Sequence, residues 1–435
     1  MKTQIRMLAT AALATALVLI CCKGDKADKG TGSKTNKAKG AATQATAQKA
    51  RKALEKTPKQ PKDAPKPVPK AVQLPDNGIK AVAVRAFSQN ACAILASGVV
   101  HCWGYGNQGA LGTGKYKNTN KPGKPVKDLG DAKQNAAQEG TVCAIRGAGE
   151  VGCWGSNEFG RLGNGKTKDS AVPVAVKGIN DAVQIAVSKA NTCVISTARG
   201  LLCWGDNSYG QLIGVKNLKK PKLKPVVVKK VTDVVEIALA EFTVCARLKT
   251  GKVQCWGGHS YNKLGKAELV DKVQWSHTPV EVTGLTDVKQ LAGNTYHFCA
   301  LRATGQVLCW GRNREGQLGD GTVKDRGVPT PVKGLSNVTS IAVGYQHTCA
   351  VVKTGEVWCW GENDKGQLGD GTRKNQSSPV RVAGPANVVE VTAATTMTCG
   401  KRKSGGLFCW GDNSAGQLGG GDNKPHTGPV VVVAP

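Results

Sequence analysis

The residues most able to do chemistry in this sequence are cysteines, and they come in pairs. The stretch TCAVVKTGEVWCWGENDKGQLGDGT (Thr348–Thr372) holds two cysteines ten positions apart, with Trp-Gly directly after the second. Such a pair could ligate a metal, exchange electrons or staple the chain as a disulfide. Together with Cys21 and Cys22, seven pairs account for all 16 cysteines: Cys92 with Cys102, Cys143 with Cys153, Cys193 with Cys203, Cys245 with Cys255, Cys299 with Cys309, Cys349 with Cys359, and Cys399 with Cys409.

The spacing of the pairs favours the disulfide. A zinc site usually draws on C-x₂₋₄-C pairs, and a redox site uses C-x-x-C near a helix N-terminus; free buried thiols are the remaining alternative. Opposing Cys349 and Cys359 leaves a three-residue loop, Lys353-Thr354-Gly355, which favours glycine in its last position. Opposed residues on antiparallel strands lie about 4.5 Å apart, within reach of a disulfide. Six of the seven pairs have that glycine: Gly98, Gly149, Gly251, Gly305, Gly355 and Gly405.

The elements that position these pairs recur with a period near fifty residues. The first cysteines step along the chain by 51, 50, 52, 54, 50 and 50 residues. Each second cysteine is followed by Trp-Gly, a degenerate N-x-x-G-Q-L-G segment, a P-V-x-V strand and a further short strand. A repeat of this length with four short strands is typical of a β-propeller blade. We predict an all-β, seven-bladed β-propeller with four-stranded blades and repeat cores near 92–112, 143–163, 193–214, 245–265, 299–319, 349–369 and 399–419.

Strand alternation adds a packing prediction. Cys359 and Trp360 point to opposite faces of their sheet because side chains alternate along a strand. Since propeller blades pack face to face, we expect the Trp of one blade to lie against the disulfide of its neighbour.

The repeat GYQHTCAVVKTGEVWCWGENDKGQLGDGT (344–372) is similar to that of the regulator of chromosome condensation family, a seven-bladed propeller, over about residues 71–435. Its cysteine pairs resemble the exported bacterial lipoprotein branch of such repeats rather than the nuclear one. Blade four departs from the pattern with His259 and Asn262, where other blades have Asn and Gly. The fold implies closure by strands from both chain ends. Because Lys70–Leu74 and Gly428–Val433 both resemble the P-V-x-V strand, one copy is expected to be redundant.

The N-terminus predicts export. Lys2 and Arg6 precede an apolar run, Leu8–Ile20, which is short for a membrane span but suits a secretion signal. The run ends in LICC, which resembles a lipobox with Cys22 as the lipidated residue and Cys21 in place of the usual small residue; the alternative is an ordinary cleaved signal. Residues 1–22 are therefore predicted to be a signal peptide that leads to a lipid anchor at a bacterial outer membrane or cell surface. A periplasmic or secreted protein is the alternative.

Residues 23–70 are rich in Lys, Ala, Thr and Pro and contain no aromatic residue, so we predict a disordered tether. The formal net charge of the chain is +30, of which the leader carries +2 and the tether +10, leaving +18 on residues 71–435. That excess attracts polyanions without specificity, so no specific nucleic-acid partner is expected.

No other motif predicts chemistry. The six histidines form no ring of ligands, because His297 and His347 share a repeat position that other blades fill with Asn, Thr or Met. GDGT (319–322 and 369–372) lacks the alternating acidic ligands of a calcium loop. No nucleophile-elbow, Walker or zinc-protease motif is present. We predict no catalytic residue, no metal and no cofactor, and hence no enzyme.

Two insertions interrupt the repeat and predict where a partner binds. Blade three carries VKNLKKPKLKPVVVKK (215–230), and blade four carries KAELVDKVQWSH (266–277). The functional interpretation is a basic, aromatic-bearing patch for an anionic partner; the alternative is a solvated loop with a tucked-in Trp. The candidate partner-binding residues are Lys216, Lys219, Lys220, Lys222, Lys224 and Trp275.

These features predict a monomeric, lipid-anchored binding scaffold for a protein or an anionic envelope component. An inhibitor of a secreted enzyme is the alternative. Guanine-nucleotide exchange, which the family name suggests, fits poorly with export and disulfides.

Overall fold

The fold is built almost wholly from short strands. The computed structural model describes residues 78–213 and 220–435, so Cys22, the predicted leader and tether, and Lys70–Leu74 lie outside the described residues. The helices within those ranges are single 3₁₀ turns: η1 (Glu158–Gly160), η2 (Ser260–Asn262) and η3 (Ala267–Leu269). None of them is long or apolar enough to cross a membrane.

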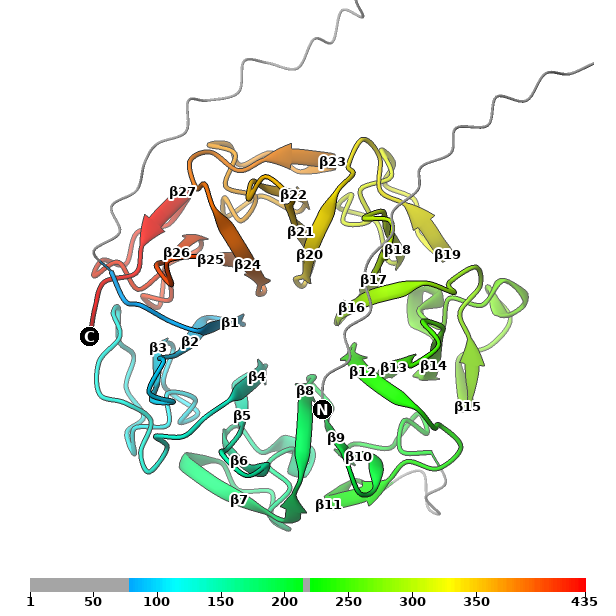
Figure 1. The fold of residues 1–435 in the computed structure, drawn as a ribbon, viewed down its shortest axis with the longest axis horizontal. Helices are drawn as coiled ribbons and strands as arrows, with labels where there is room; N and C mark the ends of the chain where they lie inside the picture. The colour runs from blue at the N-terminus through cyan, green and yellow to red at the C-terminus, as the bar shows by residue number, and fades with distance from the viewer. Residues whose placement is uncertain (1–77, 214–219) are drawn as a thin grey trace, which may run out of the picture. The chain divides into compact units, whose positions relative to one another are not determined.

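The strands form seven antiparallel sheets arranged as a ring around a central channel, which confirms the seven-bladed propeller (Figure 1). The inner strands are β1 (Ala83–Phe87), β4 (Gln134–Gln138), β8 (Ala182–Val187), β12 (Val234–Leu239), β16 (Val288–Asn294), β20 (Val338–Val343) and β24 (Val388–Ala393). The second strands are β2 (Asn90–Ile94), β5 (Thr141–Ile145), β9 (Asn191–Ser196), β13 (Thr243–Leu248), β17 (His297–Arg302), β21 (His347–Val352) and β25 (Met397–Arg402).

The outer half of each blade completes the sheet. The third strands are β3 (Val100–Gly104), β6 (Glu150–Gly155), β10 (Gly200–Gly205), β14 (Val253–Gly258), β18 (Val307–Gly311), β22 (Val357–Gly361) and β26 (Leu407–Gly411). The outer strands are β7 (Ser170–Asn180), β11 (Lys222–Val227), β15 (Trp275–Glu281), β19 (Arg326–Pro331), β23 (Gln376–Arg381) and β27 (His426–Val431).

Blade one differs from the four-stranded prediction. Its sheet has three strands, and an irregular segment takes the place of the outer strand. This segment meets β3 at the bridge from Gly104 to Thr119, at a hydrogen bond from Val126 N to Val100 O, and between His101 Nδ1 and Gly123 O (2.8 Å). Pro122 and Pro125 lie in this segment, and proline supplies no N–H to a strand ladder. The segment therefore follows the edge of β3 without pairing along it.

Among the residues that the structure describes, strands from the two chain ends do not share a sheet. β27, from the C-terminal end, pairs with β26 and belongs to the sheet β24–β27. It is therefore the outer P-V-x-V strand of the last blade, which is the strand that Lys70–Leu74 also resembles. The first described residues join blade seven instead, where Ile79 N donates to Val432 O (3.2 Å) and Ala81 N donates to Gly405 O (2.9 Å). The described part of one chain end thus supplies all four strands of the last blade, while the predicted contribution of Lys70–Leu74 lies outside the described residues.

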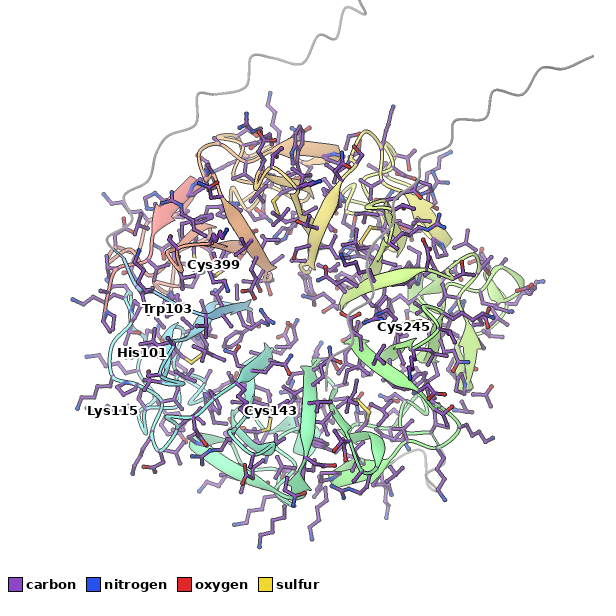
Figure 2. All side chains as sticks on the ribbon, in the orientation of Figure 1. His101, Trp103, Lys115, Cys143, Cys245 and Cys399 are labelled. Carbon is purple, nitrogen blue, oxygen red and sulfur yellow. A yellow bond between two sulfur atoms is a disulfide. The ribbon has the colours of Figure 1, made fainter. Side chains whose placement is uncertain are left out.

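Disulfides join the second and third strands within each of the seven blades, with Cα–Cα distances of 4.0–4.1 Å. In blade six Cys349 pairs directly with Cys359, and Gly355 takes φ +79° in the turn. The sulfur atoms lie inside the blades (Figure 2). Such a set of bonds indicates an oxidising environment. The bonded pairs are those that the ten-residue spacing predicts, namely Cys92 with Cys102, Cys143 with Cys153, Cys193 with Cys203, Cys245 with Cys255, Cys299 with Cys309, Cys349 with Cys359, and Cys399 with Cys409.

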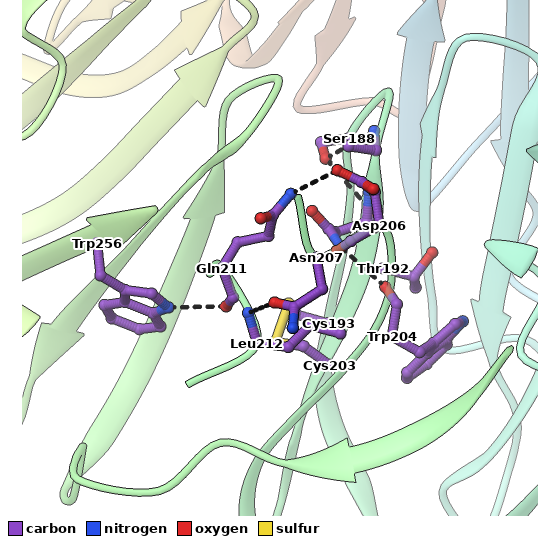
Figure 3. Close-up of a disulfide and its surroundings, with 12 residues drawn as sticks. Ser188, Thr192, Cys193, Cys203, Trp204, Asp206, Asn207, Gln211, Leu212 and Trp256 are labelled. Carbon is purple, nitrogen blue, oxygen red and sulfur yellow. Dashed lines mark hydrogen bonds between the residues drawn. A yellow bond between two sulfur atoms is a disulfide. The ribbon is translucent and has the colours of Figure 1, made fainter. Parts of the chain in front are cut away.

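Each Trp that follows a cysteine joins its blade to the preceding one. Trp256, in blade four, packs in one cluster with Cys193 and Cys203 of blade three, as the strand alternation predicts, and its Nε1–H donates to Gln211 O (2.9 Å; Figure 3). The same bond recurs at all seven junctions and includes the seam, where Trp103 donates to Gln417 O (3.0 Å). The loop that accepts the bond is held by its own Asn: Leu212 N donates to Asn207 Oδ1 (2.8 Å).

A second set of bonds runs around the channel. Gln184 Oε1 accepts from Ile237 N (2.8 Å), Glu236 Oε2 from Leu291 N (3.0 Å), and the same position serves at Gln134 and Gln290. This residue stands nine positions before the first cysteine of its blade. At these four junctions, inner strands are tied to their neighbours by side-chain to backbone bonds that strand pairing within a blade does not supply.

Candidate partner-binding face

One face of the ring carries the turns between inner and second strands together with the loops that follow each Trp-Gly; we name it the tip face. A loop of one blade meets the turn of the next. Tyr209, in the loop of blade three, packs against Phe242, in the turn of blade four, with ring centroids 4.8 Å apart. Tyr261 of blade four packs edge-on against Tyr296 of blade five at 5.5 Å. The architecture therefore places aromatic side chains at consecutive junctions.

The second of these contacts extends into a larger cluster. Tyr296 and Tyr345 lie 4.7 Å apart, and their hydroxyls share a hydrogen bond of 2.9 Å. The Arg312 guanidinium lies over the rings of Tyr296 (4.6 Å) and Tyr261 (5.7 Å), a cation–π arrangement. All four side chains are half-buried, so the cluster is rigid and still presents surface.

Polar groups hold this cluster in place. Arg312 donates to Gln346, whose Nε2 donates to Glu362 Oε1 (2.7 Å). Burial, with Asp364 nearby, raises the pKa of Glu362. Burial and the hydrogen bond with Tyr296 raise the pKa of Tyr345, so its hydroxyl keeps its proton.

A buried cation lies beneath the turn of Tyr296. Lys263 occupies the repeat position that is Gln in most blades, and its Nζ donates to Thr295 O (2.9 Å). Burial lowers the pKa of Lys263 to about 8. In blade two Arg161 does the same for the next turn, donating to Lys189 O (2.6 Å). These two side chains are bound to backbone and act by positioning the turns.

The junction of blades three and four holds an exposed aromatic side chain on this face. Trp275 is 45% exposed and lies 6.5 Å from Tyr209 and 6.1 Å from His277. We define the aromatic arc as Tyr209, Phe242, Trp275, Tyr261, Tyr296 and Tyr345. It crosses the junctions from blade three to blade six.

The central channel opens inside this arc. It has a volume of about 370 Å³ and is lined by inner strands of all seven blades. At the tip face Gln138 Nε2 donates to Asn294 Oδ1 (2.9 Å), which links blade two to blade five across the opening. Lys189 and Glu241 form an ion pair of 2.9 Å beside it. These four polar side chains are thus occupied by one another.

Among the described residues, those that the sequence predicts to form one basic, aromatic-bearing patch do not lie together in the structure. Lys220 and Lys224 are exposed and Lys222 is half-buried, at the start of β11 against blade two, where Gly165 N donates to Leu223 O (2.9 Å). Trp275 lies one junction further on, against Tyr209, and no contact joins it to the lysines within the described ranges. Lys216 and Lys219 fall in the undescribed segment 214–219.

Sequence reasoning predicted Trp275 but missed Arg312 and the other five members of the aromatic arc, namely Tyr209, Phe242, Tyr261, Tyr296 and Tyr345. A signal exists in the repeat: the turn residues three or four positions before the first cysteine are aromatic in blades four to six only. Blade four also shows how a departure is absorbed, since His259 Nδ1 accepts from Leu264 N (3.1 Å) in the role of the usual Asn. Asn262 takes φ +59°, where other blades use Gly.

Comparison with known proteins identifies similar chains. A family model described as the RCC1-like domain matches residues 182–434, and that of the regulator of chromosome condensation (RCC1) repeat matches residues 148–195. The chain is 29% identical to the mitochondrial RCC1 domain-containing protein RUG3 of Arabidopsis thaliana over 257 residues, 58% of this chain and 46% of that protein. It is 28% identical to the ultraviolet-B receptor UVR8 of the same plant over 256 residues, with the same 58% and 46% covered. The matched part thus spans less than half the length of these relatives.

Two solved structures show the same fold. Prp20p from Saccharomyces cerevisiae superposes with a TM-score of 0.68 at 20% identity, covering 78% of this chain and 87% of that one. Human WBSCR16 superposes with a TM-score of 0.64 at 20% identity, covering 77% and 93%.

Proposed function

The chain belongs to the family of RCC1-like domains, and from that premise we propose that it is an exported, lipid-anchored scaffold that binds a protein partner through the aromatic arc of its tip face. The family is one of binding and regulatory propellers. Beyond this family role, we propose that the chain is exported, that a lipid anchors it and that the tip face binds the partner.

The aromatic arc is the observation that carries the proposal. Aromatic residues make up only 5% of the chain, and seven of its nine Trp residues are consumed by packing between blades. Six further aromatic side chains nevertheless gather on one face, together with Arg312. Tyr, Trp and Arg on a rigid, half-buried surface are the residues that dominate protein–protein binding energy.

The same residues favour binding over catalysis. Two polar groups of the arc, the hydroxyls of Tyr296 and Tyr345, bind each other. Within residues 78–213 and 220–435, no three His, Cys, Asp or Glu side chains come together as a metal-ligand set. We therefore propose a non-enzymatic role, in which the arc recognises a surface and transforms nothing.

The seven disulfides support export, since such bonds persist in oxidising compartments. We propose that residues 1–22 are a signal peptide, that Cys22 is acylated, and that residues 23–70 are a tether to a bacterial envelope membrane. A mass measurement on the N-terminal peptide of the native protein tests this part. We expect the peptide to begin with a diacylglyceryl-modified Cys22, and a peptide that begins at another residue contradicts the proposal.

The partner is tested by crosslinking the full-length protein in its native envelope and identifying what is captured. Trp275→Ala and Tyr296→Ala should each reduce capture about tenfold or more, because each removes a central aromatic contact. Tyr116→Ala is the matched control, since Tyr116 is 56% exposed on blade one and lies outside the arc.

Charge reversal separates the two candidate surfaces. If Lys219→Glu, Lys220→Glu and Lys222→Glu together abolish capture and the arc variants do not, the basic insertion is the binding surface and the arc is not. A captured enzyme whose active site is occluded would make the protein an inhibitor. Captured anionic polymer in place of protein would overturn the proposed partner class.

A further inference from the structure

The face opposite the aromatic arc carries the turns between second and third strands and the linkers between blades; we name it the base face. The residue ten positions before each first cysteine is exposed there in all seven blades. In four blades it is valine: Val82 is 50% exposed, Val183 60%, Val235 43% and Val389 47%. The others are Lys133, Lys289 and Thr339. We name the four valines the valine ring.

A backbone irregularity exposes three of these valines, Val183, Val235 and Val389. In blades three to seven the residue is the extra one of a β-bulge, so that the register of β8 skips Val183 between Ala182 and Gln184. A bulge leaves its extra residue unpaired and redirects it. Sequences such as AVQIAV and VVEVTA would otherwise place this side chain within the strand ladder.

The base face also carries an excess of cations. The segments between named strands on this face, from residue 78 onward, contain twelve Lys or Arg and six Asp or Glu. Six of the cations stand on the turns themselves: Arg146, Arg199, Lys249, Lys252, Lys353 and Lys403. Apolar side chains ringed by cations match the two layers of an anionic lipid surface.

The described chain begins on this face. Ala81 N donates to Gly405 O, in the turn between β25 and β26, and Lys80 bridges to Gly406. The segment that we propose as a tether therefore joins the propeller at the base face. This step rests on the proposed function, because it needs residues 1–70 to lead to a membrane.

We propose that the base face docks onto an anionic lipid bilayer, with its cations at the phosphates and the valine ring at the headgroup boundary. The aromatic arc is then directed away from the membrane, toward the partner. A soluble polyanion would engage the cations alone and leave the valines in water, so the valine ring favours lipid.

Vesicle binding tests the surface without the anchor. The full-length chain with Cys21→Ser and Cys22→Ser is cosedimented with vesicles of phosphatidylethanolamine and phosphatidylglycerol, so that the basic tether contributes equally to every variant. The triple variant Val183→Glu, Val235→Glu and Val389→Glu should lower the partition coefficient about tenfold, since three apolar contacts become anionic.

The matched control is the triple variant Tyr116→Glu, Val273→Glu and Val323→Glu. It changes the charge by the same amount at exposed positions off the base face, so it should cost about twofold or less. Intact disulfide maps and unchanged urea midpoints establish that the variants fold.

Equal losses for both triple variants, or no loss for the valine variant, overturn the proposal. So does a valine variant whose sedimentation without vesicles differs from that of the parent, because the base face is then an interface between copies of this chain. Acylation of Cys22 is measured separately, so a missing anchor and a failed docking surface are told apart.

Discussion

At the scale of residues, two histidines connect blades five, six and seven. His297 Nε2 and His347 Nε2 lie 2.7 and 2.8 Å from the hydroxyls of Thr348 and Thr398. Each hydroxyl donates onward to a Gln carbonyl, so each accepts from its histidine, and both rings are neutral with the proton on Nε2. Both side chains are fully buried.

These histidines predict a loss of stability in mild acid. Burial lowers the pKa of both to about 3, from an ordinary 6.5. A base with a lowered folded pKa contributes stability that is fully present above pH 6.5 and is lost as the pH falls toward 3. The free energy of unfolding should fall by up to about 1.4 kcal/mol per pH unit for each histidine.

The measurement is urea unfolding at pH 6.5 and at pH 4.5. The double variant His297→Met and His347→Met, which copies Met397 at the equivalent position of blade seven, should show a shallower pH dependence than the parent protein. Taking the difference between the two proteins cancels the contribution of carboxylates such as Glu236, whose pKa is raised by burial. An identical pH dependence would show that the histidines are not kept neutral by the fold.

At the scale of elements, the N-x-x-G-Q-L-G loop forms the binding site for the Trp of the next blade; we call this site the socket. Trp410 Nε1 donates to Gln367 O (2.9 Å), and Gly369 faces the indole. A Cβ at Gly369 would come within 2.6 Å of Trp410 Nε1. The glycine is therefore needed for the approach of a neighbouring blade as well as for its turn.

Comparing Gly369→Ala with Gly371→Ala separates the cost of backbone strain in the turn from the cost of a clash with the neighbouring blade. Both positions have positive φ, +68° and +82°, so both substitutions cost about 1–2 kcal/mol of backbone strain. A Cβ at Gly371 meets nothing within 4 Å, so the strain is its whole cost. Gly369→Ala should cost about 2 kcal/mol more in urea unfolding, because it also displaces a buried hydrogen bond. Equal losses would contradict the socket.

At the scale of the whole molecule, the junctions of the ring are unequal. The residue eight positions before the first cysteine of a blade lies on the inner strand and is Ile, Leu or Val in six blades. In blade two it is Asn135. Asn135 is 1% exposed, and neither of its side-chain polar atoms has a hydrogen-bond partner. In blade three, Gln184 accepts a hydrogen bond from the backbone N–H of the next blade. Blade one has Ala83 at the equivalent position, so its side chain cannot accept such a bond from Asn135 N. The junction of blades one and two should be the weakest in the ring.

Asn135→Ile should therefore stabilise the protein by about 1–2 kcal/mol, since it removes two unsatisfied buried groups and restores the side chain of Ile185 and Ile237. The thermal midpoint is the measurement. Ile341→Asn, the reverse change at an equivalent site, is the matched control and should destabilise by about 3 kcal/mol. A lower midpoint for Asn135→Ile would show that the site holds polar partners in solution.

The sequence alone determined the blade and its number. Each disulfide joins residues ten positions apart, and a glycine in the turn sets which residues face each other, so local geometry was enough to predict the pairs, the strands and the Trp alternation. Seven copies of such a module predict a closed ring. The departure in blade one was also local in origin, because Pro122 and Pro125 lie where its outer strand was expected.

Only the tertiary structure decided which copies meet. Tyr209 and Phe242, or Tyr261 and Tyr296, come from different repeats, and their contact depends on how far one blade rotates against the next. The same packing separated Trp275 from the lysines that the sequence had grouped with it. The bulges that expose Val183 and Val235 likewise leave no mark in alternation, because an inserted residue shifts the register while the pattern of residue types is unchanged. Periodic spacing specifies a module, whereas a binding surface arises from the differences between modules once packing has brought them together.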